Sequence, residues 1–205
     1  MKFTIPFIAI LISLAFLTEA QAKVPTATVG NLKAAFTGET TASAKYASFA
    51  QQARKDGHVH IALLFEAASK AESIHANNHK AALEQLGEKA PEVKPDIKVN
   101  STRQNLEEAI KGESYEVATM YPDFLKAANV ENVNIALLSF NYAYKTEQRH
   151  KALYENALKA LDENKVSTLP SQYQVCTTCG NTYDNAGPSR CGLCMTSNER
   201  FVTFK

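Results

Sequence analysis

Two Glu-x-x-His motifs are the groups in this 205-residue sequence with the most direct bearing on chemistry. Glu72 and His75 form the first motif, and Glu147 and His150 form the second. Side chains three residues apart on a helix lie on the same face, so each motif presents a carboxylate and an imidazole together. Both groups are ligands for divalent iron or manganese. One such pair is common on a solvated helix, but two in matching register predict a metal site.

An internal repeat places a further glutamate ahead of each motif. Residues 31–39, NLKAAFTGE, recur as residues 105–113, NLEEAIKGE, which makes Glu39 and Glu113 equivalent. The repeat offset is 74 residues at these glutamates (39 and 113) and 75 at the motif histidines (75 and 150). One residue is therefore inserted between the two matches. Its position stays open, because residues 61–64 also match residues 135–138 at an offset of 74.

Four carboxylates and two imidazoles are the donor set of a dinuclear site. One Glu from each of two helices and a Glu-x-x-His from each of two others build such sites inside helix bundles. Four carboxylates neutralise two divalent ions, whereas burying the same carboxylates without cations would be prohibitive. The sequence predicts a di-iron or di-manganese site made by Glu39, Glu72, His75, Glu113, Glu147 and His150.

Three other residues are predicted to lie beside this site. Glu116 follows Glu113 by three residues, where the first repeat has Ala42, and is expected to add a carboxylate next to one metal only. Tyr46 and Tyr121 follow the repeat glutamates by seven and eight residues and are expected to hydrogen-bond metal-ligating glutamates.

The remaining histidines are expected to take no part in the chemistry. His79 lies one turn after His75 and is expected to line the outer surface or cap a contact. His58 and His60 flank the turn after Gly57 and are expected to be exposed to solvent.

Four cysteines lie close together near the C-terminus. Cys176 and Cys179 form one C-x-x-C pair, and Cys191 and Cys194 form another. Two tight turns bring four thiolates together for one tetrahedral ion, either zinc or iron. Two disulfides are the alternative in an oxidising compartment. The aromatic residues of this stretch are expected to form a small core: Tyr173, Tyr183, Phe201 and Phe204.

Four long helices must position these residues. Apolar residues spaced three and four apart predict helices over residues 29–56, 59–86, 102–128 and 131–161. Residues 87–101 contain two prolines and no periodicity, and form a linker long enough to recross a bundle. One long crossover is typical of the ferritin-like arrangement. The predicted fold is an all-α ferritin-like four-helix bundle over residues 29–165, with a small metal-binding module over residues 171–205.

The N-terminus predicts export. Residues 1–22 combine Lys2, an apolar run of about 13 residues and the ending Ala20-Gln21-Ala22, the layout of a secretory signal peptide. The run is shorter than the ~20 residues that span a bilayer, so no membrane attachment is expected after cleavage. The expected location is the periplasm. A balance of 22 Lys+Arg against 21 Asp+Glu argues against nucleic-acid binding.

The motifs together resemble those of the rubrerythrins. The resemblance rests on NLKAAFTGET, ESIH, NLEEAIKGESYE followed by MYPDF, EQRH, and the CTTCG and CGLC pairs, and extends from about residue 29 to residue 205. It implies a di-iron centre bridged by Glu72 and Glu147, and a rubredoxin-like one-iron centre on the cysteines. It also implies that Glu116 exchanges with His75 as one iron changes oxidation state. Gly192 and Met195 depart from the family pattern, which has Pro and Gly there.

The resemblance implies an enzyme. Rubrerythrins generally reduce hydrogen peroxide to water, with electrons relayed through the cysteine-bound iron from a donor that this sequence does not identify. Family members commonly pair head to tail, so a homodimer is expected. The alternatives are a ferroxidase or iron-handling protein, and a non-catalytic metal-binding protein with zinc in the tail.

Overall fold

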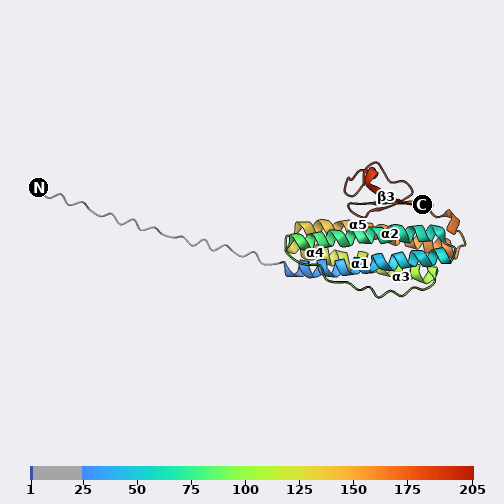
Figure 1. Cartoon of the computed structure of the whole chain (residues 1–205), viewed down its shortest axis with the longest axis horizontal. Coiled ribbons are helices and arrows are strands. Elements are labelled where there is room, and N and C mark those ends of the chain that lie inside the picture. The colour runs from blue at the N-terminus through green and yellow to red at the C-terminus, as the bar shows by residue number, and fades with distance from the viewer. Residues whose placement is uncertain (2–24) are drawn as a thin grey trace.

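The computed structural model describes Met1 and residues 25–205 (Figure 1). The predicted signal peptide, apart from Met1, lies outside the described residues. Within the described part of the chain, no helix is both long enough and apolar enough to cross a membrane.

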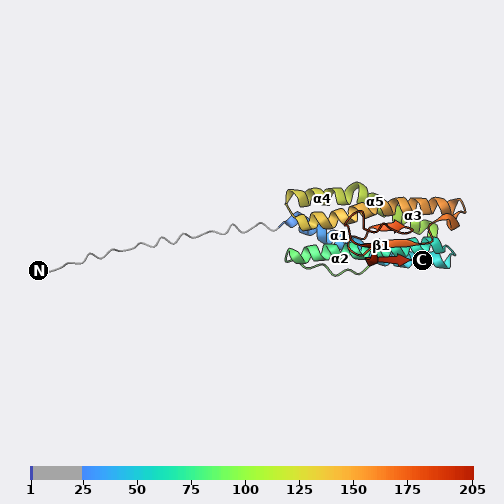
Figure 2. The same cartoon turned by 90° about the horizontal axis from the view of Figure 1, so that it is seen from above.

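Long helices run side by side along the bundle (Figures 1 and 2). The first helical hairpin turns at Gly57 (φ 83°) and the second at Asn132 (φ 56°), both in the left-handed conformation that ends helices. The helical elements of the bundle are α1 (Thr26–Lys55), α2 (Val59–Gln85), α3 (Thr102–Tyr115), η1 (Glu116–Met120), α4 (Tyr121–Val130) and α5 (Asn134–Asp162).

The predicted crossover connects α2 to α3 along the outside of the bundle (Figure 1). Its end is fixed by Ser101, which forms a capping box with Gln104 at the start of α3. Asp56, just after α1, accepts hydrogen bonds from the Thr102 amide (3.0 Å) and hydroxyl. These bonds place the start of α3 beside the end of α1.

The third helix of the bundle, predicted over residues 102–128, is helical from Thr102 to Val130 but contains a π-helical turn that the sequence did not predict. A π-helical segment, η1 (Glu116–Met120), separates α3 from α4. A π turn takes up one extra residue within a helix. The offset between repeats is 74 at Glu113 and already 75 at Tyr121. The inserted residue therefore lies in this segment.

Two apolar clusters fill the bundle, one toward each end. Tyr46, Phe65 and Tyr154 belong to the first, with the rings of Phe65 and Tyr154 5.3 Å apart. Tyr121 and Phe140 belong to the second, with rings 6.2 Å apart. The polar site described below lies between them.

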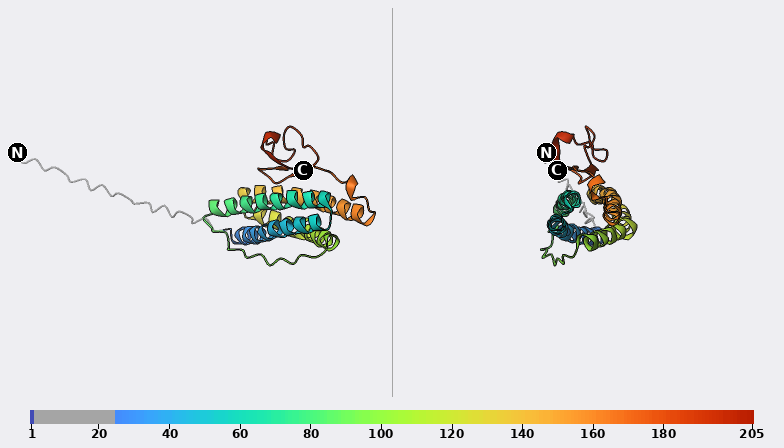
Figure 3. Two further views of the ribbon diagram at one scale, coloured as in Figure 1. Left: turned by 45° about the vertical axis from the view of Figure 1, so that its right-hand side comes forward. Right: turned by 90° about the vertical axis from the view of Figure 1, so that its right-hand side faces the viewer.

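The C-terminal module is a small antiparallel sheet of three strands in the order β2-β1-β3. It packs over α2 and α5 (Figure 3). The expected aromatic core of the tail divides in two. Tyr173 and Phe204 pack into the first bundle cluster, while Tyr183 stacks on Phe201 at 5.5 Å near the cysteines. The elements are η2 (Val166–Thr168), β1 (Tyr173–Cys176), β2 (Thr182–Asp184), η3 (Asn198–Arg200) and β3 (Phe201–Phe204).

Candidate metal centre

The six predicted ligands of the dinuclear site meet in the centre of the bundle. All are buried, with 0–2% of each residue exposed. Their potential ligand atoms form two groups, each within 4.8 Å, and Glu72 and Glu147 belong to both. Two shared carboxylates flanked by two separate donor pairs are the arrangement of two bridged ions. The first group adds Glu39 and His75, and the second adds Glu113 and His150.

Each imidazole directs Nδ1 toward both shared carboxylates. His75 Nδ1 lies 2.9 Å from Glu72 Oε2 and 2.9 Å from Glu147 Oε1. His150 Nδ1 lies 2.8 Å from Glu147 Oε2 and 3.1 Å from Glu72 Oε1. Each shared carboxylate therefore offers one oxygen to each half of the site.

The carboxylates also carry oxygens that receive no well-directed hydrogen bond, although Glu147 Oε1 and Glu72 Oε1 each lie close to a histidine Nδ1. Four buried oxygens accept no hydrogen bond among the described residues, one on each glutamate. Burying such an atom is costly, so each calls for a partner. A pair of divalent cations provides partners for all four, and the donor set fits them. The atoms are Glu39 Oε2, Glu72 Oε1, Glu113 Oε2 and Glu147 Oε1.

Protons take the place of the missing positive charge when no metal is bound. Burial, reinforced by the Glu147 charge, raises the pKa of Glu39 to about 8. Burial and the same negative charge raise the pKa of Glu113 well above its usual value. Burial alone would lower the pKa values of His75 and His150, but the adjacent carboxylates raise both well above 6.5. Metal ions entering this site would displace these protons.

The two predicted tyrosines hydrogen-bond glutamates across the repeat. The Tyr46 hydroxyl donates to Glu113 Oε1 at 2.8 Å, and the Tyr121 hydroxyl donates to Glu39 Oε1. Burial raises the pKa of both tyrosines well above 10, which keeps their hydroxyls protonated. Each tyrosine occupies one oxygen of its glutamate and leaves Oε2 toward the site.

Glu116 lies beside the cluster rather than within it. It begins η1, is half-buried, and belongs to neither group of ligand atoms. Burial and the charges of Glu39 and Glu113 raise its pKa well above 4.5.

The C-terminal module contacts both imidazoles from outside. The raised pKa values of both rings leave a hydrogen on each nitrogen when no metal is bound, and a metal on Nδ1 would leave the hydrogen on Nε2, so Nε2 donates to the tail in either state. His75 Nε2 donates to the Cys179 carbonyl at 3.2 Å, and His150 Nε2 to Thr182 Oγ1 at 2.9 Å. A Cβ on Gly180 would lie 2.3 Å from His75 Nε2, so only glycine permits this approach. Metal-ligating histidines commonly donate their second ring N–H in this way.

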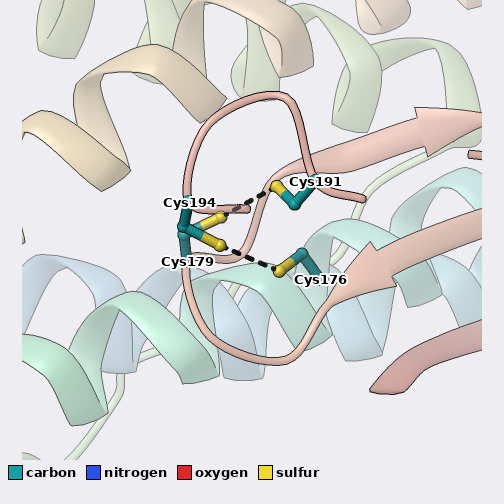
Figure 4. A group of neighbouring side chains, drawn as sticks. All are labelled: Cys176, Cys179, Cys191 and Cys194. Atoms are coloured by element: carbon teal, nitrogen blue, oxygen red, sulfur yellow. Dashed lines mark hydrogen bonds between the residues drawn. The ribbon is translucent and has the colours of Figure 1, made fainter. Parts of the chain in front are cut away.

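The four cysteines converge as predicted (Figure 4). Cys176 and Cys194 have Sγ atoms 3.5 Å apart, as do Cys179 and Cys191. A disulfide is ~2.05 Å long, whereas thiolates 2.3 Å from a tetrahedral ion lie about 3.8 Å apart. The cysteines are free, and their spacing matches a metal site.

The two unusual residues of the second cysteine turn have structural roles. Met195 adopts φ 64° and donates its amide to the Cys191 carbonyl at 2.9 Å. Gly180 repeats this geometry after the first pair, with φ 79° and a 2.9 Å bond to the Cys176 carbonyl. The Gly192 amide donates to the Tyr183 hydroxyl at 2.9 Å, a bond that proline could not make.

His79 is not at the surface, and the expectation for it was wrong. Its side chain is fully buried between Tyr121 and Ser139. The sequence contained the relevant signal, because a residue four positions after His75 shares its metal-facing side. His60 is half-buried rather than free in solvent, and its Nδ1 donates to the Leu169 carbonyl at 2.8 Å.

The helical bundle, the long crossover and the buried metal-ligating side chains together define the class of this protein. It is a ferritin-like protein with a dinuclear carboxylate–histidine site and a separate four-cysteine site. The Rubrerythrin family profile matches residues 30–158. Rubrerythrin-2 of Clostridium acetobutylicum is 30% identical over 174 residues, which cover 84% of this chain and 94% of that protein. Nigerythrin of Nitratidesulfovibrio vulgaris is 34% identical over 182 residues, covering 86% of each.

The fold of this chain is also similar to solved structures. The partially reduced state of nigerythrin superposes with a TM-score of 0.77 at 32% identity, covering 86% of each chain. A bacterioferritin from Rhodobacter capsulatus has a TM-score of 0.62 at 19% identity, covering 67% of this chain and 87% of that one, which shows the shared bundle fold. The chain belongs to the rubrerythrin family.

Proposed function

We propose that this protein reduces hydrogen peroxide to water at a di-iron centre, with electrons supplied through an iron bound by the four cysteines. The family resemblance implies this activity. The observation that carries it in this chain is the hydrogen bond from His75 Nε2 to the Cys179 carbonyl. That bond joins a candidate ligand of one metal site directly to a candidate ligand of the other.

The reaction consumes one peroxide, two protons and two electrons and releases two waters. The iron pair, when bound, supplies the electrons. Glu72 and Glu147 reach both halves of the site and would hold the two ions at a fixed separation. Tyr46 and Tyr121 fix the outer glutamates through hydrogen bonds. Glu116 holds a proton beside the site when no metal is bound and is the candidate alternative ligand to His75.

Electrons would enter at the exposed side of the tail. Cys194 is half-buried, whereas the other three cysteines are buried, so an external donor protein meets the four-cysteine site there. The tail of this chain already lies on its own dinuclear site. The homodimer stays a prediction, and the proposed activity does not depend on it.

The decisive experiment follows the tail iron optically. The full chain is loaded with iron, reduced without oxygen, and mixed with one equivalent of peroxide. The visible absorption of a ferric tetrathiolate should appear as the peroxide is consumed, and two electrons should be used per peroxide. Reduced protein that leaves peroxide unconsumed would refute the proposal.

The same preparation separates the alternatives. A ferroxidase would consume added ferrous iron and dioxygen faster than peroxide. A protein purified with zinc in the tail would show no visible charge-transfer band, because zinc has a filled d shell.

A further inference from the structure

A buried histidine that belongs to neither ligand group continues the hydrogen bonding of Glu39 away from the metal centre. His79, on α2, is fully buried. Its Nε2 lies 3.2 Å from the Tyr121 hydroxyl, and its Nδ1 lies 2.7 Å from the Ser139 hydroxyl on α5. Three helical elements therefore contribute to one continuous line of bonds that ends on Glu39.

The direction of every hydrogen in this line follows from Glu39. As a metal ligand Glu39 is ionised and only accepts, so the Tyr121 hydroxyl must donate to it. The Tyr121 oxygen then accepts from His79 Nε2–H. A neutral imidazole has one donor and one acceptor, so Nδ1 is bare and accepts from Ser139. Both nitrogens of His79 lie at hydrogen-bond distance from hydroxyls in a fully buried position, which favours the neutral ring.

This chain of hydrogen bonds has no counterpart among the equivalent residues of the other repeat. At the offset of 75 that relates Tyr46 to Tyr121, His79 corresponds to Tyr154 and Ser139 corresponds to Leu64. In that second half the Tyr154 ring packs edge-on against Tyr46 at 5.5 Å. Leu64 is apolar and has no hydrogen to donate. The Tyr154 hydroxyl makes no hydrogen bond among the described residues, so Tyr46 reaches Glu113 without a hydrogen-bonded imidazole and hydroxyl behind it.

We propose that Ser139 and His79 are positioning residues that fix the Tyr121 hydroxyl hydrogen on Glu39, so that the Glu39–His75 half of the site holds its metal more firmly than the Glu113–His150 half. Hydrogen bonds in a chain polarise one another, so the bond to Glu39 is stronger than an isolated tyrosine bond. Partners behind a metal ligand commonly change metal affinity by about 10–100-fold. The inference rests on the dinuclear site of the proposed function, but not on peroxide as its substrate.

The tautomer of His79 provides a direct test that needs no turnover. In the full-length zinc-loaded protein, ¹⁵N NMR should show a protonated Nε2 and a bare Nδ1 on His79. A hydrogen on Nδ1, or a doubly protonated ring, would overturn the proposal. Loss of Tyr121 as partner in Tyr121→Phe should shift the Nε2 signal, while Tyr46→Phe should leave it in place.

Metal titration tests whether the two halves of the site differ in metal affinity. Zinc, added after the four-cysteine site has filled, is a suitable probe because it binds imidazole and is diamagnetic. The ¹⁵N shift of each Nδ1 on coordination reports separately whether the His75 half or the His150 half has filled. The wild type should fill the His75 half first, and equal filling would overturn the proposal.

Three variants separate positioning from packing. His79→Leu should weaken the His75 half by roughly tenfold and leave the His150 half unchanged. His79→Gln retains a side-chain donor and an acceptor, and should restore most of that loss. Tyr154→Phe, at the equivalent position, should leave the His75 half unchanged. Equal weakening of both halves, or a Gln variant that matches Leu, would contradict the proposal. Should His79→Leu fail to fold, Ser139→Ala provides the same comparison with a smaller change.

Discussion

Two glutamates of this protein each serve both halves of one site. Glu72 and Glu147 direct one oxygen toward His75 and the other toward His150. The charges of both imidazoles overcome the effect of burial and lower the pKa of Glu147 to about 2, so this carboxylate is ionised even without metal. A side chain with this double role should be more sensitive to substitution than either outer glutamate.

Glu147→Gln should test that sensitivity. The amide keeps the volume but removes the charge and one accepting oxygen from both halves, so the bundle should bind at most one metal ion instead of two. Metal analysis of the purified protein checks this result. Glu155→Gln, on an exposed face of the same helix, is the matched control and should retain two ions. Two ions bound in Glu147→Gln would place the site elsewhere.

The candidate ligands and His79 differ in how well the sequence predicts their positions. The six candidate ligands were predictable because a repeat and a helical period place them on common faces. The burial of His79 was also indicated by its position four residues after His75, but the partners of its ring were not, because helical spacing does not say which neighbouring helix a side chain meets. The packing of α2 against α5 brings Ser139 to the ring, and Tyr121 reaches it from the start of α4.

At the scale of elements, η1 adjusts the register between the two halves of the third helix. A single inserted residue in an α-helix would rotate everything beyond it by ~100°. The π segment absorbs that rotation locally, so that Glu113 before it and Tyr121 after it both face the site. The sequence indicated an insertion but left its place open, because residues 61–64 still match residues 135–138 at the shorter offset of 74.

Deletion of Ala118 should remove this adjustment. Ala118 is an exposed residue of η1, so the bundle should still form. Glu113 and Tyr121 would then be unable to face the site together, and one bound metal ion should be lost. Circular dichroism checks that the bundle forms, and metal analysis counts the bound ions. Full metal content in the deletion variant would show that the π segment has no role at the site.

The docking of the C-terminal module depends on a single glycine. Gly180→Ala would place a methyl group against His75 and force an L-residue into φ 79°. We expect docking to weaken by roughly 1–3 kcal/mol. Increased proteolysis of the connection between α5 and β1 should report the loss, as should slower oxidation by peroxide of iron loaded into the four-cysteine site.

Gly192→Ala is the control for that variant. Its Cβ would meet only the Tyr183 hydroxyl, at an ordinary 3.8 Å, and its φ is not left-handed. Docking should therefore be unchanged. Equal behaviour of the two variants would show that Gly180 is not the point of contact.

At the scale of the whole molecule, the metal-free bundle contains a buried cluster whose charge balance depends on protons. The folded protein holds a proton on Glu39 between pH 4.5 and about 8, where the unfolded chain has lost it. His75 and His150 also bind protons more tightly when folded, above pH 6.5. All three groups bind more protons in the folded state, so the stability they contribute falls as pH rises through these windows.

The metal-free protein should therefore become less stable as pH rises from about 5 to about 9, by on the order of 3 kcal/mol. Bound metal replaces the protons, so the metal-loaded protein should not show this decline. Chemical unfolding of both forms across the pH range checks the prediction. A metal-free protein that gains stability over this interval would contradict the assigned directions of the pKa shifts.

The arrangement of the tail on the bundle was the part of the molecule least accessible to sequence reasoning. The cysteine spacing predicted the four-sulfur site and the helical pattern predicted the bundle. No local pattern specified that Cys179 and Thr182 would face the histidines of the same chain. That contact depends on the three-dimensional path of residues 163–172 and on the absence of a side chain at Gly180.

The bonds from His75 and His150 to the tail make metal loading and tail docking thermodynamically linked. A cation on Nδ1 draws electron density from the imidazole and makes Nε2–H a stronger donor to the Cys179 carbonyl and the Thr182 hydroxyl. Binding free energies are reciprocal, so a docked tail must increase metal affinity by the same factor that metal increases docking. A metal-loaded bundle and a docked tail therefore stabilise each other.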